Sequence, residues 1–158
     1  MEIYHIILAV CTGIYLILCS WWDLRDRMIY TFPCMMLTGL WVGYCVMMGE
    51  VEPKILLAYI LLFAVFYIIF ALTKAWGGGD SDLLLLFGAV YLAQMEGGFS
   101  LMDISRQCVS IAVILVIAAV VGLVEAKIKG ERLERDSAIA IAPGYAVVIS
   151  FFMIGGFM

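Results

Sequence analysis

Two aspartates are the residues of this chain best suited to chemistry, because each stands at a polar break between long apolar runs. Asp80 closes the segment Gly77-Gly78-Gly79-Asp80, and Asp23 opens the segment Asp23-Leu24-Arg25-Asp26-Arg27. Two carboxylates that share a site cannot both ionise cheaply, so such a pair can hold a single proton. The ionised member can take a proton from water while the neutral member donates one to a carbonyl oxygen. Brought together, these side chains could hydrolyse a peptide bond without a metal or a cofactor.

The three glycines before Asp80 are the sharper of the two signals. Consecutive glycines destabilise a helix, and they are useful where the backbone turns sharply or where another backbone comes close. Their position directly before an acid favours a functional role for Asp80. The structural alternative is a flexible turn in which Asp80 caps the following helix, and both interpretations can hold at once.

The segment that begins at Asp23 has a simpler alternative, an ordinary charged turn beside a membrane in which Arg25 and Arg27 pair with the aspartates. No serine or cysteine has a credible partner for nucleophilic catalysis, and the five cysteines form no C-x-x-C pair, so we expect them to be core residues. The single histidine, His5, lies near the other end of the first apolar run. The sequence therefore predicts neither a metal site nor a cofactor site.

The composition indicates what kind of scaffold must hold the two acids. Of the 158 residues, 66% are apolar and 14% are charged, and the mean hydropathy is +1.12. A water-soluble fold cannot cover its surface with so few polar groups, so we expect an integral membrane protein with a single domain over residues 1–158. The net charge of -4 offers no basic face to nucleic acid.

The apolar segments predict an all-α bundle of six transmembrane helices, since a helix needs roughly 20 residues to cross a hydrocarbon core of about 30 Å. The segments cover residues 3–22, 32–48, 55–74, 79–95, 104–124 and 138–157. The fourth is anomalous, because its unbroken apolar run, residues 83–93, would rise only about 16 Å. We therefore expect Asp80 near or below the level of the lipid headgroups, with Asp82 as a second candidate.

The basic residues give this bundle an orientation. Those in the first, third and fifth connections are Arg25, Arg27, Lys74, Lys127, Lys129, Arg132 and Arg135, and those in the other connections are Lys54 and Arg106. Positive residues stay in the cytoplasm, so both termini should lie outside and the odd-numbered connections inside. Asp23 and Asp80 would then share one side of the membrane and one depth.

The two motifs together, Asp23-Leu24-Arg25-x-Arg27-x-Ile29 after the first helix and Gly77-Gly78-Gly79-Asp80 before the fourth, resemble those of the type IV prepilin peptidases, bacterial membrane aspartyl proteases with a G-x-G-D motif. The resemblance covers nearly the whole chain, and Ile141-Ala142-Pro143-Gly144 is similar to the family's proline-containing last helix. It implies that Asp23 and Asp80 are the catalytic pair and that the glycines and both arginines support them. It also implies the substrate, a type IV-like prepilin that loses a short basic leader at the cytoplasmic face of the bacterial inner membrane.

Three departures from the family pattern bear on these expectations. Tyr30 and Thr31 stand where the family commonly has proline and asparagine, and Asp82 stands where it commonly has lysine. The paired C-x-x-C motifs that accompany methylation in larger members are absent from this sequence. The chain therefore resembles the short, peptidase-only members that serve tight-adherence pili, and we expect cleavage without methylation.

Other functions remain open at this stage. Buried acids beside broken helices also mark ion and proton carriers, although the sequence contains no clear internal repeat. An inactive subunit of a pilus-assembly system, an archaeal preflagellin peptidase and a presenilin-like protease are further alternatives. The connection over residues 125–136 is either a solvated loop or a receiver of the basic leader through Glu131, Glu134 and Asp136. The sequence does not indicate an oligomeric state.

Overall fold

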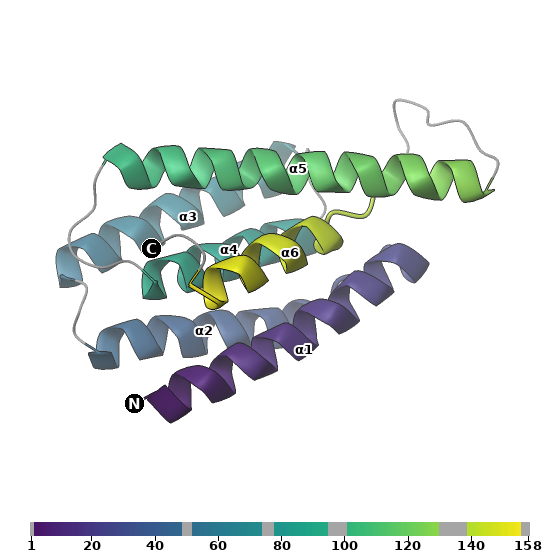
Figure 1. Ribbon diagram of the computed structural model, residues 1–158. Helices are drawn as coiled ribbons and strands as arrows, with labels where there is room; N and C mark the ends of the chain where they lie inside the picture. Colours follow the sequence, from purple (N-terminus) through teal and green to yellow (C-terminus); the bar gives the residue numbers. More distant parts are fainter. Residues whose placement is uncertain (1, 49–51, 74–77, 95–100, 130–138, 156–158) are drawn as a thin grey trace.

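The computed structural model describes residues 2–48, 52–73, 78–94, 101–129 and 139–155, and within these ranges it contains six α-helices and no strand (Figure 1). The helices are α1 (Glu2–Asp26), α2 (Thr31–Met48), α3 (Pro53–Thr73), α4 (Gly78–Ala93), α5 (Leu101–Lys129) and α6 (Ala142–Met153). The predicted all-α fold is therefore confirmed for the part of the chain that the structure describes.

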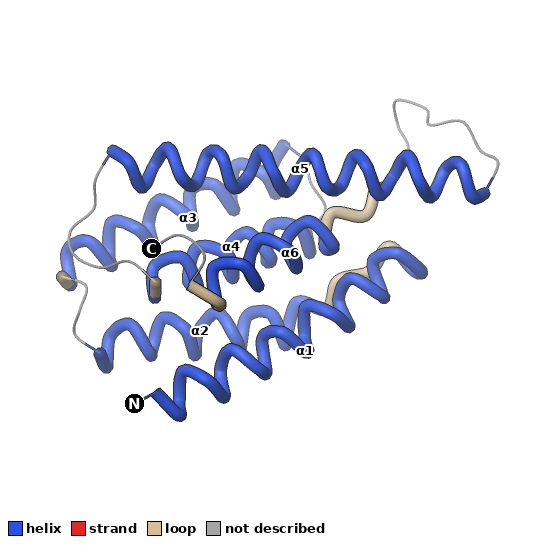
Figure 2. Tube along the Cα trace, viewed as in Figure 1, coloured by secondary structure: helices blue, strands red, loops and turns tan. Residues whose placement is uncertain are grey.

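The six helices run alternately up and down, as Figures 1 and 2 show. Three helices terminate at one end of the bundle, namely α1, α3 and α5, and the other three start there, namely α2, α4 and α6. We call this the motif end, because it carries the end of α1 with Asp23 and the beginning of α4 with Asp80. The opposite end is called the far end. This alternation places both acids at the same end of the bundle, as the sequence predicts.

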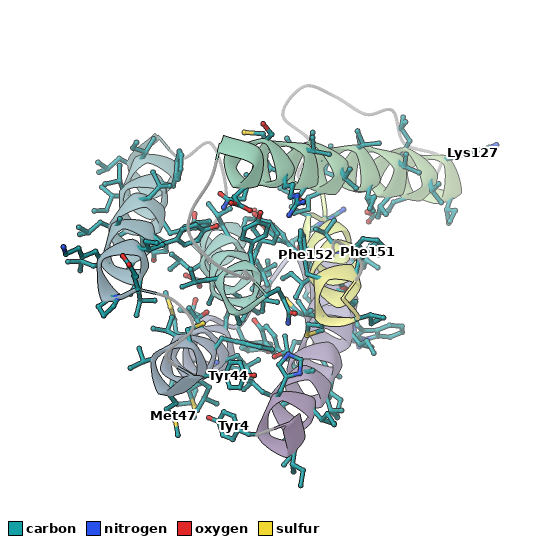
Figure 3. All side chains as sticks on the ribbon, turned by 60° about the vertical axis from the view of Figure 1, so that its left-hand side comes forward. Tyr4, Tyr44, Met47, Lys127, Phe151 and Phe152 are labelled. Carbon is teal, nitrogen blue, oxygen red and sulfur yellow. The ribbon has the colours of Figure 1, made fainter. Side chains whose placement is uncertain are left out.

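Helix α4 lies in the middle of the bundle and packs against α2, α3 and α6 (Figure 3). Its side chains from Ser81 to Leu84 and from Leu86 to Leu92 are buried. A helix that is apolar on all sides must be surrounded by other elements or by lipid, and α4 is surrounded by its neighbours. The acids at its beginning are therefore carried toward the interior of the protein.

The outer helices expose large apolar side chains instead. Two of the described helices are long and apolar enough to cross a membrane, over Ile3–Asp26 in α1 and Ser105–Ile128 in α5. Shorter apolar stretches occupy Thr31–Met47, Pro53–Ile69 and Ala142–Met153. Cys19, Cys34 and Cys45 are buried, as expected for core residues. Cys11 and Cys108 are exposed on the outward faces of α1 and α5, so for these two the prediction was wrong.

Several predicted boundaries differ from the observed ones for identifiable reasons. Helix α1 continues to Asp26, because Leu24, Arg25 and Asp26 are compatible with a helix, so Asp23 lies on its last turn and not in the connection. Helix α4 begins at Gly78, which places Asp80 within its first turn and not at the cap. Helix α6 begins only at Ala142, with Pro143 in its first turn, where the missing N–H of proline costs no hydrogen bond.

A polar network holds α3, α4 and α5 together at the far end. The Tyr91 hydroxyl donates to Asp103 Oδ1 at 3.2 Å, and the Gln107 amide donates to the Tyr59 hydroxyl. His5 lies at this end as well, where its ring nitrogen is 3.1 Å from Gln94 Nε2. The histidine therefore takes no part in the motif end, in agreement with its place in the sequence.

Candidate active site

Asp23 is held by the beginning of α6. Its side chain is only 5% exposed, and its Oδ2 accepts a hydrogen bond of 2.9 Å from the Ala142 main-chain N–H. The first N–H groups of a helix lack partners within the helix, and they carry a partial positive charge that favours a carboxylate. The residue before the helix, Ile141, gives no side-chain cap. Asp23 thus supplies from α1 the acceptor that the first turn of α6 needs.

The turn after α1 is fixed by its second arginine. Arg27 adopts a left-handed backbone conformation, with φ of 54°, and its N–H bonds to the Asp23 carbonyl at 3.2 Å, which ends the helix. The Arg27 guanidinium bonds to Glu125 Oε2 of α5 at 2.5 Å, and the two side chains are 31% and 16% exposed. Arg27 therefore ties the end of α1 to α5.

Arg25 behaves differently from Arg27. Its side chain is 71% exposed and lies 3.7 Å from the carboxylate of the neighbouring Asp26. Exposed pairs of this kind contribute little to stability. Of the two arginines that the resemblance singles out, the structure brings only Arg27 into contact with another helix near the site.

The glycine motif contacts the first turn directly. A Cβ atom built on Gly79 would lie 3.0 Å from Ile29 Cγ2 and 3.2 Å from Ile29 Cδ1, and closer still to Ile29 Cβ. Only a residue without a side chain fits this close approach. Gly78 is the first residue of α4, and Gly77 lies outside the described residues. The two motifs, about fifty residues apart in sequence, thus meet through Gly79 and Ile29.

Asp80 and Asp23 converge on a shared neighbour, Cys19. This cysteine is fully buried on α1, one helical turn before Asp23, and both carboxylates act electrostatically on its thiol. Asp80 is half-buried. It also lies close enough to Tyr145 of α6 to interact with it electrostatically. The end of α1, the beginning of α4 and the beginning of α6 therefore bring the two predicted acids into one region.

A third acid, Asp82, lies deeper in α4 and is 1% exposed. Neither of its carboxylate oxygens has a hydrogen-bond partner among the described residues. Thr31, the first residue of α2, is a polar residue close to it. The sequence marks Asp82 as a departure from the family pattern, and the structure makes it a buried acid one helical turn deeper than the Gly78 end of the helix.

Three contributors to this region do not stand out in the sequence. The Ala142 N–H is a main-chain group, Glu125 belongs to a stretch of mixed charge, and Tyr145 is one of eight tyrosines. The sequence feature that could have pointed to Ala142 and Tyr145 is the segment Ile141-Ala142-Pro143-Gly144, which directly precedes Tyr145.

Within the described ranges, no group of three or more histidine, cysteine or acidic side chains could hold a metal ion. Glu131, Glu134 and Asp136, the predicted receivers of a basic leader, lie outside the described residues. The groups that the described residues bring to this region are carboxylates, with a phenol and a main-chain N–H group close by. Comparison of the chain with protein-family models, with curated proteins and with solved structures finds no significant match.

Proposed function

We propose that the chain is a membrane-embedded aspartic endopeptidase of the type IV prepilin peptidase kind, in its short peptidase-only form. The observation that carries the proposal is the contact between Gly79 and Ile29, because it joins the two motifs on which the resemblance rests. The nearness of both Asp23 and Asp80 to Cys19 supports it. The resemblance itself supplies the substrate class, a type IV-like prepilin with a basic leader.

The proposed reaction is hydrolysis by water held between the two carboxyl groups. The ionised carboxylate takes a proton from water, the water oxygen bonds to the scissile carbonyl carbon, and the protonated carboxyl group gives its proton to the carbonyl oxygen. In the second half the carboxyl group that took the proton from water gives it to the peptide nitrogen, the C–N bond breaks, and a hydroxyl of the tetrahedral intermediate returns its proton to the other carboxylate. An acid and an amine leave, and the pair again holds one proton, so neither a metal nor a cofactor is needed.

The proposed setting is the bacterial inner membrane, crossed by all six helices, with both termini outside. The excess of basic residues in the odd-numbered connections supports a cytoplasmic motif end. The alternation of the helices is consistent with this orientation, because α1, α3 and α5 all end at the motif end. A basic leader in the cytoplasm would then reach the acids from the same side.

The experiment is co-expression with a candidate prepilin from the same organism, with the pilin mass measured for the wild type, Asp23→Asn and Asp80→Asn. Loss of a leader-sized fragment with the wild type alone is the expected result. Asp103→Asn is the matched control, because Asp103 is a buried acid of the far end. Processing by either aspartate variant of the site would refute the catalytic pair, and an intact pilin with every variant would favour an inactive assembly subunit.

A further inference from the structure

The most deeply buried tyrosine of the described chain is also the one whose hydroxyl is unused. Four tyrosines are buried, and three of them hydrogen-bond through the hydroxyl: Tyr15 to the Tyr30 carbonyl, Tyr59 to Gln107 and Tyr91 to Asp103. Tyr145 is 0% exposed, and its hydroxyl has no partner among the described residues. A buried polar group without a partner costs free energy, so its retention needs an explanation.

The place of Tyr145 in the fold points to the two acids. It follows Ala142 by three residues on α6, so it lies on the same side of the helix one turn further along. Ala142 holds Asp23 through its N–H, and Tyr145 lies within the electrostatic reach of Asp80. One turn of α6 therefore binds Asp23 and lies near Asp80.

The position of this turn is fixed by its packing. Gly144 lies against the main chain of α5, where an added Cβ atom would be 2.5 Å from the Ile114 carbonyl oxygen. Ala142 and Ile149, before and after it on α6, are fully buried. Tyr145 is thus attached to a helix that cannot shift or rotate easily, which is what a pre-organised hydrogen-bond donor requires.

We propose that Tyr145 is a third catalytic residue, whose phenol donates a hydrogen bond to the scissile carbonyl oxygen as the carbon becomes tetrahedral. The inference rests on the proposed function, and it adds a donor to the two carboxyl groups without changing the proton balance of the reaction. The hydroxyl keeps its own proton throughout. No described residue accepts a hydrogen bond from it in the resting protein, so we expect the hydroxyl to meet its acceptor when the substrate oxygen is present.

The test is Tyr145→Phe, with Tyr91→Phe as the matched control. Both variants remove only a buried hydroxyl. The Tyr91 hydroxyl bonds to Asp103 at the far end, whereas the Tyr145 hydroxyl bonds to no described residue. With purified protein and a prepilin peptide, we expect Tyr145→Phe to lower kcat by about 10²-fold, the usual effect of removing an oxyanion donor, with little change in KM or Tm. We expect Tyr91→Phe to lower Tm and to leave kcat near the wild-type value.

The outcomes separate this inference from the proposed function. Unchanged kcat for Tyr145→Phe, in a protein that needs Asp23 and Asp80 for cleavage, would overturn the role of Tyr145 alone. A fall in kcat that matches a fall in Tm would assign Tyr145 to packing and would also overturn it. If neither Asp23→Asn nor Asp80→Asn impairs cleavage, or if the wild type cleaves no prepilin, the proposed function fails and this inference fails with it.

Discussion

The main-chain N–H of Ala142 donates a hydrogen bond of 2.9 Å to Oδ2 of Asp23, across 119 positions of sequence. The beginning of α6 is thereby joined to the last turn of α1, and a side chain proposed to act in catalysis also completes the fold. The two roles can be separated by the choice of substitution, because an amide oxygen can accept this hydrogen bond but cannot serve as an acid or a base.

Asp23→Asn and Asp23→Ala should therefore differ in stability and agree in activity. Asparagine keeps an acceptor for the Ala142 N–H, so the thermal unfolding midpoint should stay near that of the wild type. Alanine leaves the N–H unpaired and should cost about 1 kcal/mol, as the loss of a helix cap does. Both variants should lose prepilin cleavage. Unfolding in detergent, followed by circular dichroism, checks the difference, and equal stability of the two variants would contradict the structural role of this hydrogen bond.

Gly79→Ala should impair both folding and cleavage, because its Cβ atom would collide with Ile29. Overpacking of this kind typically costs about 1–3 kcal/mol, and here it would also push the beginning of α4 away from α1. Gly13→Ala and Gly43→Ala are the controls, since an added Cβ meets no atom within 4 Å at either position. Cleavage rates and unfolding midpoints should fall only for Gly79→Ala, whereas the midpoints of the two controls should stay the same or rise, because alanine favours a helix more than glycine does.

A second substitution tests whether Ile29 is the cause. Ile29→Gly removes the colliding atoms, so combining it with Gly79→Ala should restore part of the lost cleavage. Residues in contact show such non-additive effects, whereas distant residues do not. Strictly additive losses in the double variant would show that the contact between positions 29 and 79 does not limit activity.

The sequence predicts the helices that meet in this region better than the contacts that join them. Apolar segment lengths and the two motifs predict six helices and place Asp23 and Asp80 at one end, because both signals depend on local residue types. The end of α1 was predicted four residues too early, since a charged helical turn at the end of an apolar run looks like a loop. Pairings between distant elements, such as Arg27 with Glu125, leave no local pattern from which to predict them.

Asp82 shows where sequence comparison alone gives an incomplete account. As a departure from the family pattern it is only a change of charge, but the structure buries it without a hydrogen-bond partner among the described residues. An unpaired buried acid lowers stability, so Asp82→Leu, which leaves no polar group to satisfy, should raise the free energy of unfolding by about 1 kcal/mol. Asp80→Leu should not, because Asp80 is only half-buried. Unfolding in detergent measures both variants, and an Asp82→Leu variant that is no more stable than the wild type would contradict this expectation.

Arg27→Gln should lower cleavage by about tenfold, because the loss of its bond to Glu125 frees the turn that follows Asp23, and small displacements of catalytic groups are costly. Glu125→Gln should have a similar effect. Arg25→Gln is the matched control, since the exposed pair of Arg25 with Asp26 contributes little, and its cleavage rate should stay within about twofold. Equal losses for Arg25→Gln and Arg27→Gln would indicate a shared role in binding the substrate, not in fixing the turn.

The orientation of the bundle can be tested with single cysteines in a variant from which the five native cysteines have been removed. Met28 lies exposed in the turn of the motif end, and Glu52 lies exposed just before α3 at the far end. A membrane-impermeant maleimide added to intact cells should label Glu52→Cys, whereas Met28→Cys should react only after the inner membrane is permeabilised, because the basic residues favour a cytoplasmic motif end. The reverse labelling would place the acids outside, where they could not meet a cytoplasmic leader, and the proposed substrate would have to be abandoned.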